Sequence, residues 1–152
     1  MKKLLAVFLV YSVTLLVSCK KESLQSYLVE SNKRKEVTNL ELPINFIELT
    51  EDHLSIEKKA VYKTIKKVSF TGFAAKKIDG STYEIEKNKL KKILGISPYK
   101  KLMKFKSNGN SFSIYRIADS APIDEIIVFG YGKKLGVGVA RILGDNMKCQ
   151  AI

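Results

Sequence analysis

The hydrophobic pattern of the chain begins with a long apolar segment over residues 4–17, which no later stretch equals. Lys2 and Lys3 precede this segment, and the small residue Ser18 stands directly before Cys19. A short apolar segment with a positive start and a small residue at its end is typical of a secretory signal peptide, and it is too short to span a membrane. The cysteine after Leu-Val-Ser indicates a lipoprotein signal, so we expect cleavage after residue 18 and lipidation of Cys19.

Behind this signal we expect a tether at residues 19–23 and one domain over 24–152, because 134 residues suffice for one core but hardly for two. Helical spacing of apolar residues predicts helices at 23–31, 57–65 and 81–94, the last opened by a Ser81–Glu84 capping box. Shorter helices are expected at 43–49, after Ser97-Pro98, and at 145–152.

Alternation of apolar and polar residues predicts strands, at 38–42, 68–74, 111–117, 123–129 and 135–142. The connections between the last three strands are short, which indicates a meander. Residues Ile126–Phe129 are all apolar, so this strand is expected to be central and covered on both faces, at least in part. The pattern therefore predicts an α+β fold of about five mainly antiparallel strands, with helices packed on the sheet.

The charge of the chain is strongly positive, at +12. Without Lys2 and Lys3, 25 basic residues remain against 15 acidic ones, which leaves +10. Residues 87–118 contain no Asp or Glu, and they include the candidate residues for binding an anionic surface: Lys87, Lys91, Lys92, Lys100 and Lys101. Such a face attracts anionic lipid, lipopolysaccharide phosphates or an acidic envelope protein. Of the 27 basic residues only three are Arg, however, so a solvated lysine-rich surface is the competing interpretation. Nucleic acid is not expected as a partner of an exported protein.

Motifs for catalysis and cofactor binding are incomplete in this chain. Gly130-Tyr131-Gly132 and Gly136-Val137-Gly138 do not complete a nucleotide-binding loop, and two S-x-x-K sequences lack the partner motifs of penicillin-binding enzymes. His53 is the only histidine, so we expect no metal site, no cofactor and no catalytic residues. A small hydrolase with an unrecognised Ser/His53 site remains the alternative.

Two further residues carry specific expectations. Asp119-Ser120-Ala121 matches a short sequence used for O-glycosylation in some bacteria and is also ordinary turn chemistry, so Ser120 is a candidate modification site. Cys149 has no intramolecular partner once Cys19 is lipidated, and we expect it to be a small buried residue.

The mature chain resembles Bacteroidota lipoproteins that carry the domain of unknown function 4252. The residues that carry this resemblance are spread over 24–150: Ser26–Leu28, Val37–Pro43, Tyr99–Met103, Ser113–Arg116, Ile123–Val128 and Leu143–Met147. The resemblance implies an envelope location, a compact α+β domain and a frequent association with extracytoplasmic sigma-factor systems. It provides no activity or catalytic residues to transfer.

Together these features predict a lipid-anchored envelope protein that binds a partner or has a structural or envelope-stress role, rather than an enzyme. A regulatory partner of a sigma-factor system is a further alternative. The residues after Cys19 lack the acidic run of surface-exported lipoproteins, which favours the outer membrane with the domain facing the periplasm.

Overall fold

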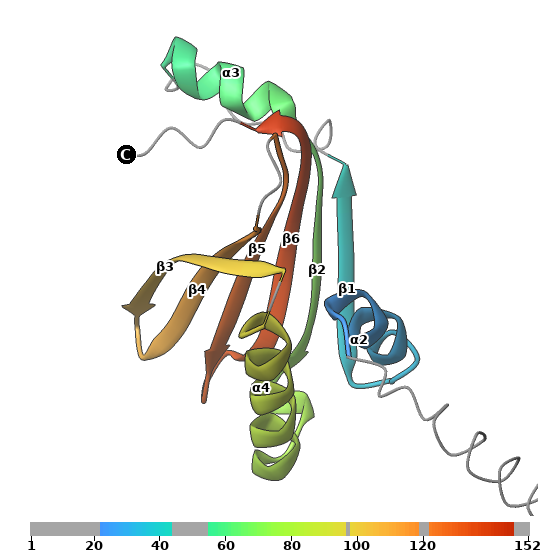
Figure 1. The fold of residues 1–152 in the computed structure, drawn as a ribbon. Helices are drawn as coiled ribbons and strands as arrows, with labels where there is room; N and C mark the ends of the chain where they lie inside the picture. The colour runs from blue at the N-terminus through green and yellow to red at the C-terminus, as the bar shows by residue number, and fades with distance from the viewer. Residues whose placement is uncertain (1–21, 44–54, 97, 119–121, 148–152) are drawn as a thin grey trace, which may run out of the picture.

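The computed structural model describes residues 22–43, 55–96, 98–118 and 122–147 of the chain. Its elements follow in the order α2 (Leu24–Ser31), β1 (Val37–Pro43), α3 (Ile56–Thr64), β2 (Ile65–Ala74), the 3-10 turn η3 (Ala75–Lys77), α4 (Gly80–Leu94), β3 (Tyr99–Ser107), β4 (Asn110–Ile117), β5 (Ile123–Gly132) and β6 (Gly136–Met147). The strands form one antiparallel six-stranded sheet in the order β1-β2-β6-β5-β4-β3 (Figure 1). The predicted α+β class is confirmed, with six strands where about five were expected.

The ends of the two helices that pack on the sheet are set by side-chain caps. Ser23 opens α2, because its hydroxyl accepts from the backbone N–H of Ser26 and the Ser26 hydroxyl in turn lies 3.0 Å from the backbone N–H of Ser23. In α4 the cap is Asp79, whose Oδ1 accepts from the backbone N–H of Thr82 at 2.7 Å. The expected Ser81 capping box is therefore wrong, because the helix begins two residues before the position that this box requires.

Strand β3 is the element that the sequence pattern missed. A short helix was expected after Ser97-Pro98, but the chain enters β3 at Tyr99 and turns into β4 through Asn108-Gly109. Both turn residues have positive φ, 49° and 76°, as a two-residue hairpin of type I′ requires. The predicted meander of three strands is confirmed and extends to four, from β3 to β6. Residues 145–147, expected to be helical, belong to β6, and the rest of that expected helix lies outside the described residues.

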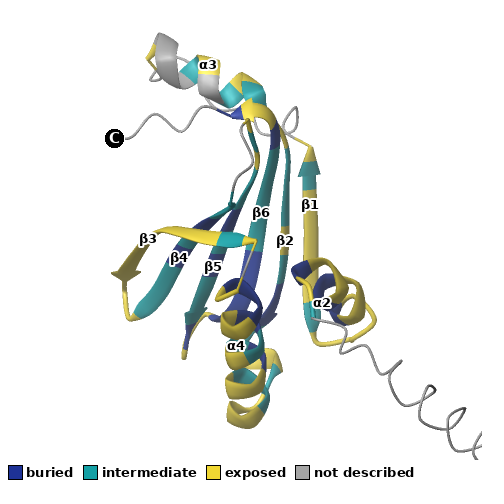
Figure 2. Cartoon of the chain, in the orientation of Figure 1, coloured by how far each residue is buried: buried dark blue, intermediate teal, exposed yellow. Residues whose placement is uncertain are grey.

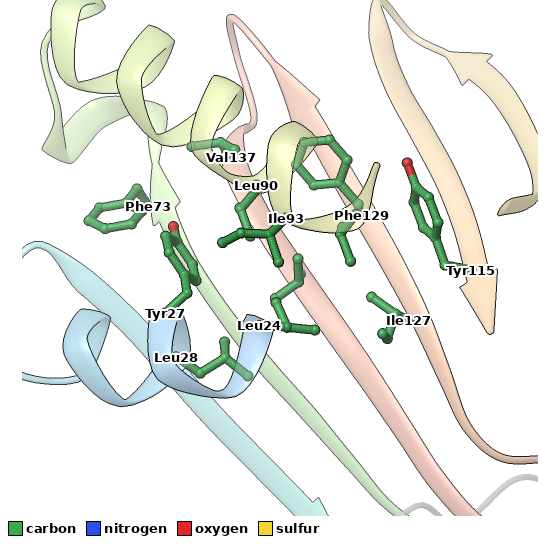
Figure 3. Packing of buried hydrophobic residues seen from close by; sticks show 12 residues of the cluster. Leu24, Tyr27, Leu28, Phe73, Leu90, Ile93, Tyr115, Ile127, Phe129 and Val137 are labelled. Atoms are coloured by element: carbon green, nitrogen blue, oxygen red, sulfur yellow. The ribbon is translucent and has the colours of Figure 1, made fainter. Parts of the chain in front are cut away.

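The core lies between one face of the sheet and the helices α2 and α4, which cross in front of it in Figure 1. Figure 3 shows Leu24 and Tyr27 of α2 and Leu90 and Ile93 of α4 above Phe73, Phe129 and Val137 of the strands. The buried residues of this layer are Leu24, Tyr27, Leu28, Phe73, Leu90, Ile93, Leu94, Tyr115, Ile127, Phe129, Val137 and Val139. Because side chains alternate along a strand, the residues between these buried positions point to the opposite face of the sheet.

That opposite face is apolar and open to solvent over much of its width. It carries Leu40 and Phe70 on the neighbouring strands β1 and β2, which are 50 and 39 % exposed, and Met103 and Phe105 on β3 at the other edge, which are 54 and 44 % exposed. In Figure 2 the edge strand β3 is almost entirely in the exposed colour. As expected, Ile126–Phe129 lies in an interior strand: Ile127 and Phe129 are buried under the helices, and Ile126 and Val128 are half-buried on the open face, so the cover there is partial.

Candidate functional site

Lysines of α4 lie over the ring of Tyr131, on the helix-covered side of the sheet. The Lys91 Nζ is 4.7 Å from the ring centroid of Tyr131, and the Lys87 Nζ is 6.0 Å from it. Lys87 also lies 5.0 Å above the ring of Tyr83, one turn before it on α4. Both ammonium groups therefore make cation–π contacts with aromatic faces rather than extending freely into water.

Strand β3 adds two more cations to this group. By the register of the β3–β4 and β4–β5 pairs, Lys106 stands opposite Ser111 and Ser111 opposite Tyr131. Lys104 lies on the same face, two residues before Lys106 along the strand and opposite Ser113. We refer to Lys87, Lys91, Lys104 and Lys106, gathered around Tyr131, as the lysine cluster.

The pKa of Tyr131 reflects its hydrogen bond and the positive charges of this cluster. The pKa of Tyr131 is lowered below its ordinary value of 10.0, first by a hydrogen bond with Ser111 and further by the charges of Lys91 and Lys104. A phenol whose ionised form is favoured lies in a site that favours negative charge. The arrangement is therefore suited to holding an anion between α4 and the β3–β4 hairpin.

Only one lysine of the cluster forms an ion pair with a carboxylate in the described part of the chain. Lys87 donates to Glu84 Oε1 at 2.6 Å, and this hydrogen bond raises the pKa of Lys87. Lys91, Lys104 and Lys106 have no acidic partner among the described residues. Within the described part of the chain, three of the four charges are thus without a carboxylate that would compete with an external anion.

The structure brings together some of the predicted binding residues and separates others. Lys87 and Lys91 belong to the lysine cluster, and Lys101 lies on the same face, with its Nζ 5.6 Å from the ring of Tyr115. Lys92 is exposed on α4, whereas Lys100 points to the opposite face of the sheet, in register with Arg116. The expectation of one common surface is therefore wrong for Lys100, because neighbouring residues of a strand face opposite ways.

Lys104, Lys106, Ser111 and Tyr131 were not among the predicted binding residues. Their signal was the alternation of lysine with Met103 and Phe105 along β3, which marks a strand with one polar face. The lysines of β3 also have a structural use. This strand is at the edge of the sheet, and lysines on an edge strand oppose pairing with a second chain.

A second polar group, buried between α2, α4 and the sheet, was also missed. Glu86 is 4 % exposed, and it accepts a 2.8 Å hydrogen bond from the Tyr27 hydroxyl and an ion pair from Arg34. Burial, together with the hydrogen bond to Glu86, raises the pKa of Tyr27 far above its ordinary value. The Arg34 guanidinium stacks 4.4 Å above the ring of Phe73. Glu86 and Tyr27 bond inward, and the half-exposed Arg34 also pairs with Glu36, so the group connects elements rather than presenting a site.

Four residues with sequence-based expectations lie outside the described residues: Cys19, His53, Ser120 and Cys149. Lipidation of Cys19, glycosylation of Ser120 and the hydrolase alternative with His53 therefore stay predictions. In the described part of the chain no three metal-ligating side chains come together. None of its helices is long and apolar enough to cross a membrane.

The chain was compared with protein-family models, curated proteins and solved structures. No curated protein and no solved structure matches it. One family model matches residues 27–152, from the Tyr27 of α2 to the last residue, and its description is "Domain of unknown function (DUF4252)". This match covers the helices, the sheet and the lysine cluster described above, and the chain belongs to the DUF4252 family.

Proposed function

We propose that this protein is a non-enzymatic, lipid-anchored module of the bacterial cell envelope whose domain binds phosphate-bearing lipid headgroups through the lysine cluster. The observation that carries the proposal is the convergence of Lys87, Lys91 and Lys104 around Tyr131. Lys106 lies on the same face two strands from Tyr131, and one of these four lysines has a carboxylate partner among the described residues. A phosphate group takes several charged hydrogen bonds at once, and clustered lysines from two elements provide them.

The anchor supports this proposal from the sequence. Cys19 follows an apolar segment with a basic start, and α2 begins at Leu24, only five residues later. An acylated Cys19 would hold the domain within a short distance of the bilayer. Burial of each acyl methylene contributes about 0.8 kcal/mol, so several chains make the attachment effectively permanent. At that range, weak contacts of individual lysines with headgroups act together because the domain cannot diffuse away.

The location we propose is the outer membrane with the domain facing the periplasm, in a Bacteroidota envelope. It rests on the lipoprotein signal and on the missing acidic run after Cys19. Replacing Cys19 with Ala should abolish fatty-acid labelling and release the protein from membranes. Protein that remains membrane-bound without labelling would contradict the anchor.

Headgroup binding is testable with the unacylated Cys19→Ala chain and vesicles. Binding to vesicles of anionic phosphatidylglycerol should exceed binding to zwitterionic phosphatidylcholine and should fall as salt is added. Lys91→Gln and Lys104→Gln should each weaken the binding about fivefold, since a lysine near an anionic surface contributes about 1 kcal/mol.

Lys33→Gln and Lys35→Gln are the matched controls, because both lysines are exposed in the turn between α2 and β1. They carry the same change of charge outside the lysine cluster. If they weaken vesicle binding as much as Lys91→Gln does, attraction follows net charge alone and the proposed site is wrong. A useful second readout is the pKa of Tyr131, which a bound phosphate should raise because it offsets the positive potential of Lys91 and Lys104.

A further inference from the structure

The open face of the sheet contains a trough formed by small residues. Thr38, Gly72, Gly138, Gly130 and Phe112 lie side by side across five neighbouring strands. Three successive glycines leave the middle of this row without side chains. The next row on the same face holds Phe70, Ala140 and Val128, so the floor continues at Ala140.

The rings of Phe70 and Phe112 lie over parts of this floor. The Phe70 ring reaches within 3.1 Å of the position that a Cβ on Gly138 would occupy, and the Phe112 ring within 3.0 Å of the equivalent position on Gly130. Leu135, in the turn before β6, lies 3.7 Å from the latter position. These residues line a cavity of about 370 Å³ that is open to solvent on one side, which we call the trough. This volume is within the range of roughly 300–1,000 Å³ that small-molecule sites occupy.

The chemistry of the trough is apolar along its length and polar at one end. Thr38 carries the only polar side chain among the residues that line it. The Lys77 Nζ lies 3.4 Å from Thr38 Oγ1, and no acidic side chain of the described residues forms an ion pair with Lys77. An apolar trough that ends at a hydroxyl and at an ammonium with no acidic partner among the described residues is complementary to a molecule with one long hydrocarbon part and one anionic head.

We propose that the trough binds a free long-chain fatty acid, with its acyl chain along the floor from Gly130 to Ala140 and its carboxylate at Lys77 and Thr38. The acyl chain would cover Phe70, which is large, apolar and 39 % exposed. The rings of Phe70 and Phe112 lie over the glycines of the floor, and a flexible single chain can follow their surface more closely than a bulky ring system can. The proposal concerns the face opposite the lysine cluster and does not depend on headgroup binding there.

The test uses the full unacylated Cys19→Ala chain with oleate as the probe. Binding is measured by calorimetry and, as a second measurement, by displacement of a fluorescent fatty-acid analogue. Oleate should bind one per chain. Leu135→Glu should weaken it about tenfold or more through loss of an apolar wall. Leu102→Glu is the matched control, because Leu102 is equally exposed, 45 % against 46 %, and does not line the trough.

A second pair of variants tests the head of the ligand. Lys77→Glu should weaken the binding of oleate about tenfold, which corresponds to the loss of one charged hydrogen bond, and should leave the binding of oleyl alcohol unchanged. Lys76→Glu, at the neighbouring exposed lysine of η3, should leave both unchanged. Ala140→Leu fills the floor without placing a charge and should also abolish binding, while circular dichroism shows that the sheet is intact.

Several results would overturn the assignment. Absence of oleate binding, or equal losses in Leu135→Glu and Leu102→Glu, would show that the trough is not the site. If oleyl alcohol binds as tightly as oleate, the carboxylate contact at Lys77 is wrong. Binding by the unacylated chain but not by the acylated protein in nanodiscs would identify its own anchor as the occupant. A concentration-dependent dimer that Leu135→Glu dissociates, with no oleate binding, would identify a second copy of the chain.

Discussion

Replacing Glu86 with Leu should destabilise the domain by about 2 kcal/mol, because it removes the charged acceptor of the buried Tyr27 hydroxyl and leaves that hydroxyl the weaker, neutral partner Ser31. The Tyr27 hydroxyl donates to Glu86 Oε2 at 2.8 Å, and Tyr27 is 2 % exposed, so water cannot take the place of the carboxylate. A hydrogen bond to a charged group contributes roughly 1.5–3 kcal/mol. The ion pair with Arg34 adds less, about 0–1 kcal/mol, because the Arg34 side chain is 39 % exposed and solvent screens it. Burial of the leucine offsets part of the sum.

The assay is urea unfolding of the Cys19→Ala chain followed by circular dichroism, with Glu84→Leu as the control on the same helix. Glu84 is exposed, and among the described residues its ion pair is with Lys87, so its replacement should change the free energy of unfolding by about 0.5 kcal/mol or less. Tyr27→Phe removes the Tyr27 hydroxyl, so the double variant Tyr27→Phe/Glu86→Leu should be more stable than the two single losses predict, by about 1 kcal/mol. Additive losses, or a loss below about 0.5 kcal/mol in Glu86→Leu, would refute this reasoning.

Three further predictions concern single positions. Asp79→Ala should lower the melting temperature at pH 7. Because the hydrogen bond at the start of α4 lowers the pKa of Asp79, its stabilising effect is present above the ordinary carboxyl pKa of 3.8 and lost as pH falls through the lowered value, so the two proteins should converge at low pH. Absorbance titration should show one tyrosine ionising below pH 10, and Ser111→Ala should raise this pKa of Tyr131; an unchanged titration would contradict the hydrogen bond. Gly136→Ala should cost more than about 3 kcal/mol, because φ is 98° and a Cβ would meet the Phe73 carbonyl oxygen, whereas Gly80→Ala, with open space around it, should be neutral or stabilising in thermal melts.

Periodicity predicted most of the secondary structure because the elements that pack on the core bury one face each. Leu24, Tyr27 and Leu28 recur at helical spacing and are buried, and Leu90, Ile93 and Leu94 do the same in α4. Strand β3 was missed because its alternation of Met103 and Phe105 with lysines is short and no residue within it is buried. The Asn108-Gly109 pair was the local signal that could have identified the β3–β4 hairpin.

The candidate sites were less predictable than the elements. Lys87 and Lys91 were selected from a run without acidic residues, but their grouping with Lys104 and Lys106 depends on the strand register beside Tyr131. The trough depends on Gly72, Gly138 and Gly130, which are remote in sequence and adjacent only because β2, β6 and β5 pair in that order. Nothing in the local sequence distinguishes Glu86 from an exposed acidic residue on a helix. Its burial depends on contacts with Tyr27 of α2 and Arg34 of the turn that follows α2.

By itself the sequence determined the α+β class, the two helices that cover the sheet and five of its six strands, because local periodicity records which residues face a core. It also predicts the lipidation of Cys19, since the signal that directs it is a contiguous stretch. The tertiary structure alone decided which face of the sheet stays open, which lysines share a surface and where Lys77 lies. These properties depend on strand order and register, which bring together residues that no local pattern connects.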